Sequence, residues 1–140
     1  MSMIDEKALI KAALLAREYA YAPYSGFSVG AALLSSDGRI FTGCNIESAS
    51  YTPTTCAERT ALVKAISEGV RHFSAIAVVG SKTGEPPSSF CSPCGVCRQF
   101  LYEFYSPGFM VYMAKSPDEF IMRPLDELLP LAFGPKSLLS

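Results

Sequence analysis

FSVGAALLSSDGRIFTGC, residues 27–44, carries two apolar runs on either side of a polar turn. The turn contains Asp37-Gly38, a dipeptide typical of tight hairpin connections, because glycine adopts positive φ angles without steric cost. The pattern predicts an antiparallel hairpin with strands over 28–35 and 39–45. We expect this hairpin to begin a sheet on which the helices of the chain pack.

Three helices are expected around this hairpin. Apolar residues with helical spacing predict the first over 3–20, ending before Pro23, because the residue that precedes a proline avoids the α region. The second is expected over 56–68, with Gly69 as the residue that ends it. The third is expected over 94–104, after a loop rich in glycine, proline and serine.

The remaining elements predict the architecture. A continuously apolar strand over 74–79 is typical of a sheet that is covered on both faces. Two more strands are expected over 109–114 and 119–123, and short helices over 124–130 and 133–138. The order α-β-β-α-β-α-β-β-α favours an α/β fold. We expect a three-layer α/β/α arrangement around a mixed five-stranded sheet, in a single domain over residues 1–140.

Composition excludes some classes of function. The net charge of the 140-residue chain is −1 and no basic run is present, so no nucleic-acid partner is expected. The apolar runs are too short to span a bilayer. The start, MSMIDEKALI, does not resemble a signal peptide, and five cysteines, an odd number, favour reduced thiols in the cytoplasm. An apolar content of 49% favours oligomerisation.

The cysteines are the strongest chemical signal. Cys94 directly follows Pro93, and Cys94 and Cys97 lie three residues apart at the start of one expected helix. Cys56 lies at the start of another expected helix. Helix N-termini lower the pKa of a thiol. Three thiolates fit a tetrahedral zinc ion whose fourth position stays open, as in catalytic sites. His72, in a turn, is expected at the surface and not at the metal.

Other interpretations remain open for these cysteines. A C-x-x-C pair alone is also typical of a thiol redox protein or of small buried residues. Cys91 forms a second C-x-x-C with Cys94, but it precedes Pro93 and so lies outside the helix. We expect Cys91 and Cys44 in the core. A structural zinc module would instead need a fourth protein ligand, and a redox protein would not need metal.

Glu58 and Arg59 follow Cys56 directly on the expected helix. Zinc lowers the pKa of water, and Glu58 is close enough to take the released proton without binding the metal. The alternative is a glutamate that only stabilises a helix N-terminus. Three thiolates and Zn²⁺ have a formal charge of −1, so we expect Arg59 or Arg98 to offset it by hydrogen bonds to sulfur, unless they form surface ion pairs.

These residues together resemble a known family. Cys56-Ala57-Glu58, followed by Pro93-Cys94-Gly95-Val96-Cys97-Arg98-Gln99, is similar to the zinc-binding pattern of the cytidine deaminases. The resemblance covers nearly the whole chain and is to the small homotetrameric branch that acts on nucleosides. Further segments carry it: 22–25, 27–34, 43–47, 57–61 and 127–130.

The resemblance implies an enzyme that binds one Zn²⁺ per chain. It would hydrolyse cytidine and 2′-deoxycytidine to uridine and 2′-deoxyuridine plus ammonia, in pyrimidine salvage. Glu58 would protonate N3 and pass a proton to the departing amine. The zinc ligands would be Cys56, Cys94 and Cys97, and Arg59 would offset their charge.

The resemblance also implies a set of substrate contacts. Asn45 and Glu47 would hold the ribose 3′-hydroxyl, and Ala57 would donate its backbone N–H to the pyrimidine O2. Phe27 would form a wall of the base pocket. Phe133 and Tyr51 would reach the substrate from neighbouring subunits of a homotetramer.

One rival enzyme shares this zinc chemistry. A deaminase of a modified cytosine nucleoside, such as blasticidin S, would keep the cysteines and Glu58 but would need a different sugar pocket. Asn45-Ile46-Glu47 favours an ordinary ribose, because a buried polar pair strongly selects a hydroxyl group.

Overall fold

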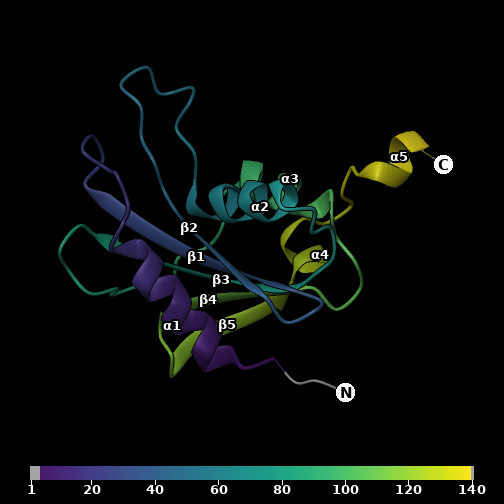
Figure 1. The fold of residues 1–140 in the computed structure, drawn as a ribbon, viewed down its shortest axis with the longest axis horizontal. Helices are drawn as coiled ribbons and strands as arrows, with labels where there is room; N and C mark the ends of the chain where they lie inside the picture. The colour runs from purple at the N-terminus through teal and green to yellow at the C-terminus, as the bar shows by residue number, and fades with distance from the viewer. Residues whose placement is uncertain (1–3, 140) are drawn as a thin grey trace.

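A five-stranded mixed sheet forms the centre of the computed structural model, which describes residues 4–139 (Figure 1). Its spatial order is β2-β1-β3-β4-β5. Only β3 and β4 pair in parallel, and the other neighbours are antiparallel. The predicted mixed sheet is confirmed. The strands are β1 (Phe27–Ser35), β2 (Ile40–Cys44), β3 (Phe73–Lys82), β4 (Met110–Ser116) and β5 (Glu119–Pro124).

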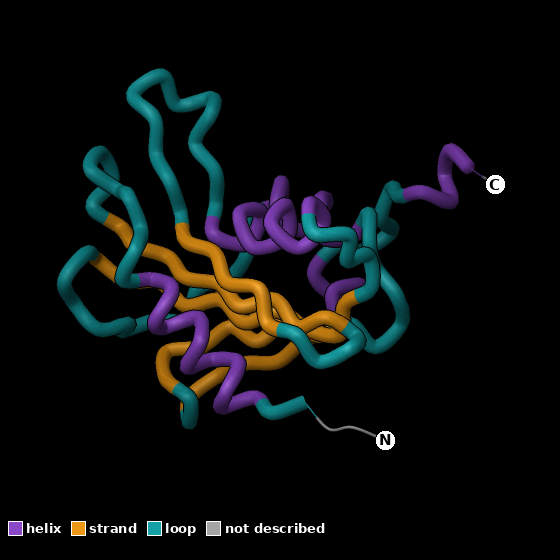
Figure 2. The backbone as a smooth tube through the Cα atoms, viewed as in Figure 1, coloured by secondary structure: helices purple, strands orange, loops and turns teal. Residues whose placement is uncertain are grey.

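Helices cover both faces of this sheet, as predicted (Figures 1 and 2). One face packs on α1 through Leu9, Ile10 and Ala13, and the other on α2 and α3 through a cluster that includes Leu62 and Leu101. The strands serve both layers because successive side chains alternate between faces. The helices are α1 (Glu6–Arg17), α2 (Ala57–Ser67), α3 (Gly95–Tyr102), α4 (Leu125–Leu128) and α5 (Pro135–Leu139).

The predicted hairpin is confirmed. β1 and β2 pair in antiparallel register, with Leu34 opposite Ile40, and Gly38 in the turn has a φ of +94°. A positive φ of this kind favours glycine, because a Cβ would clash with the backbone.

Three helices are shorter than their sequence patterns predicted. α4 covers Leu125–Leu128 within the expected 124–130. α1 ends at Arg17 and not at residue 20, while residue 3 lies outside the described residues. α3 ends at Tyr102 and not at 104. After α1 and after α3 the next residues make i→i−3 backbone hydrogen bonds, such as Ala20 N to Arg17 O and Phe104 N to Leu101 O. The apolar spacing continues through such turns, so it overestimates the helix length.

The start of α2 lies directly against β2. A Cβ at Gly43 would lie 2.4 Å from Ala57 O and 2.5 Å from Ala61 N, so only glycine allows this approach. The contact fixes the first turn of α2 at the end of a strand, next to α3. Within the described residues, no helix is long and apolar enough to cross a membrane.

Candidate active site

Two helix N-termini meet at one point and bring three thiols together. Cys56 is the N-cap of α2, Cys94 is the N-cap of α3, and Cys97 lies in the first turn of α3. Their sulfur atoms all lie within 4.8 Å of one another. Neither N-cap side chain caps its own helix, so the thiols remain available to each other. The predicted convergence of these cysteines is confirmed.

The spacing of the sulfurs fits a zinc ion. Sγ of Cys94 lies 3.9 Å from Sγ of Cys56 and 3.4 Å from Sγ of Cys97. Three sulfurs bound at about 2.3 Å to a tetrahedral zinc lie about 3.8 Å apart. All five cysteines are free thiols, and neither Cys44 nor Cys91 joins the cluster. His72 is exposed between α2 and β3, as expected.

Arg59 points its guanidinium group at the sulfurs. Nη2 donates to Cys56 Sγ at 3.6 Å and to Thr54 O at 3.3 Å. Its Nε is buried and has no hydrogen-bond partner among the described residues. Hydrogen bonds from Cys97 and then Arg59 lower the pKa of the Cys56 thiol to about 5. The Arg59 guanidinium, a donor that stays charged, fits a site that holds thiolates, and hence a cationic metal.

Arg98 does not share that role, so one of the two sequence alternatives is wrong. Its Nε donates to Pro93 O at 2.7 Å and its Nη1 donates to Leu128 O at 2.9 Å. Two of its N–H donors therefore bind backbone carbonyls, and no hydrogen bond from Arg98 to a thiol is found among the described residues. Arg98 instead links Pro93, just before α3, to Leu128, the last residue of α4.

Replacing Arg59 by alanine is expected to weaken zinc retention about tenfold, in the range of an outer-shell partner of a metal ligand. The variant loses the positive charge that stabilises the three thiolates. Competition with a chromogenic chelator measures the zinc affinity. Arg71→Ala, which removes an exposed arginine of the α2–β3 connection, is the matched control. Equal zinc affinity in both variants and the wild type would contradict the charge argument.

Glu58 lies two residues beyond the Cys56 N-cap, in the first turn of α2. Only 4% of it is exposed. Burial raises the pKa of its carboxyl to about 7, and the negative charge of Cys56 acts in the same direction. A carboxyl group that titrates near neutral pH can both accept and release a proton at the working pH.

Asn45 and Glu47 bind the backbone at the start of β1 and just before it. Asn45 accepts from Val29 N and donates to Phe27 O, both at 2.8 Å, which leaves one amide hydrogen available. Glu47 accepts hydrogen bonds from the backbone N–H of Tyr24 and from the backbone and hydroxyl of Ser25. These bonds, the Ser25 hydroxyl first, hold the pKa of Glu47 below its usual value.

Phe27 and Ala57 lie at the starts of β1 and α2. Phe27 is 41% exposed, whereas Ala57 is fully buried. The N–H of Ala57 belongs to the first helical turn, where backbone donors have no partner within the helix. Ser25 supports this region through its bonds to Glu47 and to the N–H of Phe27. The sequence analysis did not single it out, although it belongs to segment 22–25, which carries the resemblance.

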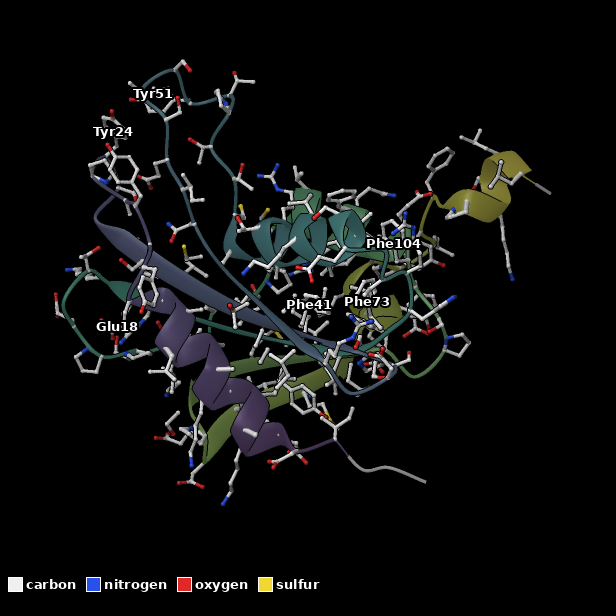
Figure 3. The ribbon with its side chains drawn as sticks, viewed as in Figure 1. Glu18, Tyr24, Phe41, Tyr51, Phe73 and Phe104 are labelled. Carbon is white, nitrogen blue, oxygen red and sulfur yellow. The ribbon has the colours of Figure 1, made fainter. Side chains whose placement is uncertain are left out.

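Tyr51 and Phe133 point outward from their own chain. Tyr51 lies at the outer end of the long loop between β2 and α2, with 74% of it exposed and a φ of +64° (Figure 3). Phe133, between α4 and α5, is 58% exposed, and its carbonyl accepts a hydrogen bond from Gln99 of α3.

A cavity of about 660 Å³ between α1 and the β1–β2 turn shares no residue with the thiol site.

Comparisons with known proteins agree with this geometry. The family model described as cytidine and deoxycytidylate deaminase zinc-binding region matches residues 3–113. The chain is 47% identical to a cytidine deaminase of Sporosarcina psychrophila over 135 residues, 96% of either chain. Its fold is similar to the crystal structure of cytidine deaminase from Burkholderia pseudomallei, with a TM-score of 0.80, 48% identity, and coverage of 90% of this chain and 97% of that one.

A second solved structure, cytidine deaminase from Mycobacterium tuberculosis, gives the same result. The TM-score is 0.80 at 39% identity, with coverage of 94% of this chain and 99% of that one. The similarity therefore extends over the sheet and both helix layers, and over the zinc-binding region in particular.

Proposed function

The chain belongs to the cytidine and deoxycytidylate deaminase family, and we propose that it hydrolyses cytidine and 2′-deoxycytidine to uridine and 2′-deoxyuridine plus ammonia. One observation carries the proposal. Two helix N-termini hold three thiols within 4.8 Å of one another, and buried Glu58 lies in the first turn beside them. We assign residues 1–140 to a single domain of this type.

The zinc-binding region has a matching donor set in this chain. Cys56, Cys94 and Cys97 would hold one zinc ion per chain, which would supply a Lewis acid that activates water. Glu58 takes a proton from the water that adds to C4 and delivers it to N3. It then takes the second proton from the new C4 hydroxyl and passes it to the exocyclic amine, so that the C4 carbonyl forms as the C4–N4 bond breaks and ammonia leaves. Its burial supports this shuttle.

The remaining site residues orient the nucleoside. The Ala57 N–H binds the pyrimidine O2, and the Phe27 ring forms one wall of the base pocket. Asn45, through its remaining amide hydrogen, and Glu47, through its carboxylate, bind the ribose 3′-hydroxyl. The hydrogen bonds that Asn45 and Glu47 make to the backbone support this role, because they hold both side chains in place before substrate binds.

Replacing Asn45 by alanine is expected to lower kcat/KM for cytidine about tenfold or more, because the sugar hydroxyl loses its donor. The loss should be much smaller for 2′,3′-dideoxycytidine, which lacks the 3′-hydroxyl. Steady-state kinetics on both nucleosides measures the difference, and the zinc content should not change. Equal losses on the two substrates would contradict the assignment of Asn45 to the sugar.

We further propose a homotetramer in which Tyr51 and Phe133 complete the sites of neighbouring subunits. The support is their exposure, together with that of other apolar side chains such as Leu131 and Val96. Light scattering measures the mass of the assembly, and a monomer at assay concentration would reject the tetramer.

A cytoplasmic place in pyrimidine salvage is proposed because five free thiols suit a reducing compartment.

A comparison of substrates tests the proposed activity against its rival. Purified protein is given cytidine, 2′-deoxycytidine or blasticidin S, and the absorbance change of the cytosine ring is followed. We expect turnover of both ordinary nucleosides. Turnover of blasticidin S with none of cytidine would replace this proposal by the antibiotic-deaminase alternative.

A further inference from the structure

Gly80 of β3 has two close neighbours where a side chain would be. A Cβ at this position would lie 2.8 Å from Phe27 Cε2, 3.2 Å from Phe27 Cζ and 3.0 Å from Cys91 Sγ. Contacts below about 3 Å force a neighbour to shift, because protein interiors are close-packed. The absence of a side chain at Gly80 therefore leaves the space that the Phe27 ring and the Cys91 thiol share.

The main chain of Phe27 is held independently of this contact. Its N–H donates to Ser25 Oγ at 3.1 Å, and its carbonyl accepts from Asn45 Nδ2 at 2.8 Å. With the backbone fixed at both groups, the ring can respond to a change in packing only by rotating or tilting. Gly80 and Cys91 border the space on one side of this ring.

Cys91 is the second neighbour of Gly80. It is half-buried, packs against the core on the α2–α3 side of the sheet, and does not join the cluster of three thiols. Burial raises the pKa of its thiol to about 12, and the charges of Glu58 and Cys56 add to this effect. Cys91 is thus a neutral, weakly polar group beside the space at Gly80, and the charge of Glu58 acts on it.

We propose that Gly80 and Cys91 are positioning residues that set the location of the Phe27 ring, and thereby the width of the base pocket. They would then decide how strongly the enzyme distinguishes cytidine from a cytidine with a larger base. The proposal rests on the proposed function, in which Phe27 is a wall of that pocket. Pocket width matters because one extra methyl group on a substrate can change its kcat/KM relative to the unmethylated substrate by about 10- to 200-fold.

The test compares cytidine with 5-methylcytidine in Gly80→Ala, Cys91→Ala and the double variant. Gly80→Ala pushes the ring toward the base, so the kcat/KM ratio of 5-methylcytidine to cytidine should fall about fivefold. Cys91→Ala removes the sulfur, so the ratio should rise. The double variant should return to within about twofold of the wild type, because the new methyl group occupies the vacated space.

A binding measurement separates positioning from effects on the reaction. Calorimetry with uridine and 5-methyluridine should show the same shifts in relative Kd, at unchanged zinc content. Cys44→Ala, which removes another half-buried thiol, is the control and should keep the wild-type ratios. If Gly80→Ala does not fold, Cys91→Val carries the test, and its larger side chain should lower the ratio.

Equal effects on both nucleosides in every variant would overturn the proposal, even if stability fell. A double variant that kept the ratio of Gly80→Ala would also overturn it, because the space left by the Cys91 sulfur would then not relieve the ring. Failure of the proposed function would be seen separately, since zinc-loaded wild type would then turn over neither nucleoside.

Discussion

Replacing Glu58 by glutamine is expected to lower kcat for cytidine by about 10³-fold, in the range of a lost general acid–base group. Glutamine has nearly the same shape as the buried glutamate but cannot exchange a proton with water, N3 or the departing amine. Zinc content and the Kd for uridine should stay close to the wild type, since Glu58 is not assigned to the metal. Initial rates and metal analysis on one preparation measure both.

Glu68→Gln is the matched control, because it makes the same chemical change at the exposed end of the same helix. It should keep wild-type rates. If the loss in Glu58→Gln stayed below about tenfold, the acid–base role would be rejected, and Glu58 would be a glutamate that stabilises the start of α2.

Replacing Cys97 by serine is expected to remove zinc and reduce turnover below detection. Cys97 is fully buried between the two helix starts, and a neutral hydroxyl is a much poorer zinc ligand than a thiolate. Unfolding temperature should also fall, since bound metal stabilises the native state. Metal analysis, activity and thermal unfolding measure the three effects. Chelator should reproduce the loss in the wild type, and added zinc should reverse it there only.

Cys44→Ser controls for the loss of one thiol outside the cluster. It should keep both zinc and activity. Retention of cytidine turnover by metal-free wild type would instead show that the reaction does not need zinc. Zinc retention by Cys97→Ser together with full turnover would show that Cys97 is not a ligand.

Local sequence signals were sufficient for the elements that hold the site. Pro93 before Cys94, Gly69 after α2 and the Asp37-Gly38 turn each determine backbone geometry within a few residues, so the helix starts and the hairpin were predicted closely. The convergence of Cys56 with the C-x-x-C pair followed from placing three thiols at two helix starts.

The sequence analysis favoured Arg59 over Arg98 for the charge at zinc, but local spacing alone does not distinguish the two. Each arginine lies within three residues of a zinc-ligand cysteine on its own helix. By local spacing, either guanidinium group could therefore reach a thiolate. The difference comes from Leu128, thirty residues after Arg98, whose carbonyl takes one of its donors. The role of Gly80 was hidden for the same reason, because Phe27, Gly80 and Cys91 meet only in the folded chain.

The most direct test of the account adds cytidine to the purified protein and follows the fall in cytosine absorbance, with ammonia and zinc counted on the same sample. We predict complete conversion to uridine, one ammonia per nucleoside and one zinc per chain. Zinc at one per chain without any conversion of cytidine would contradict the account.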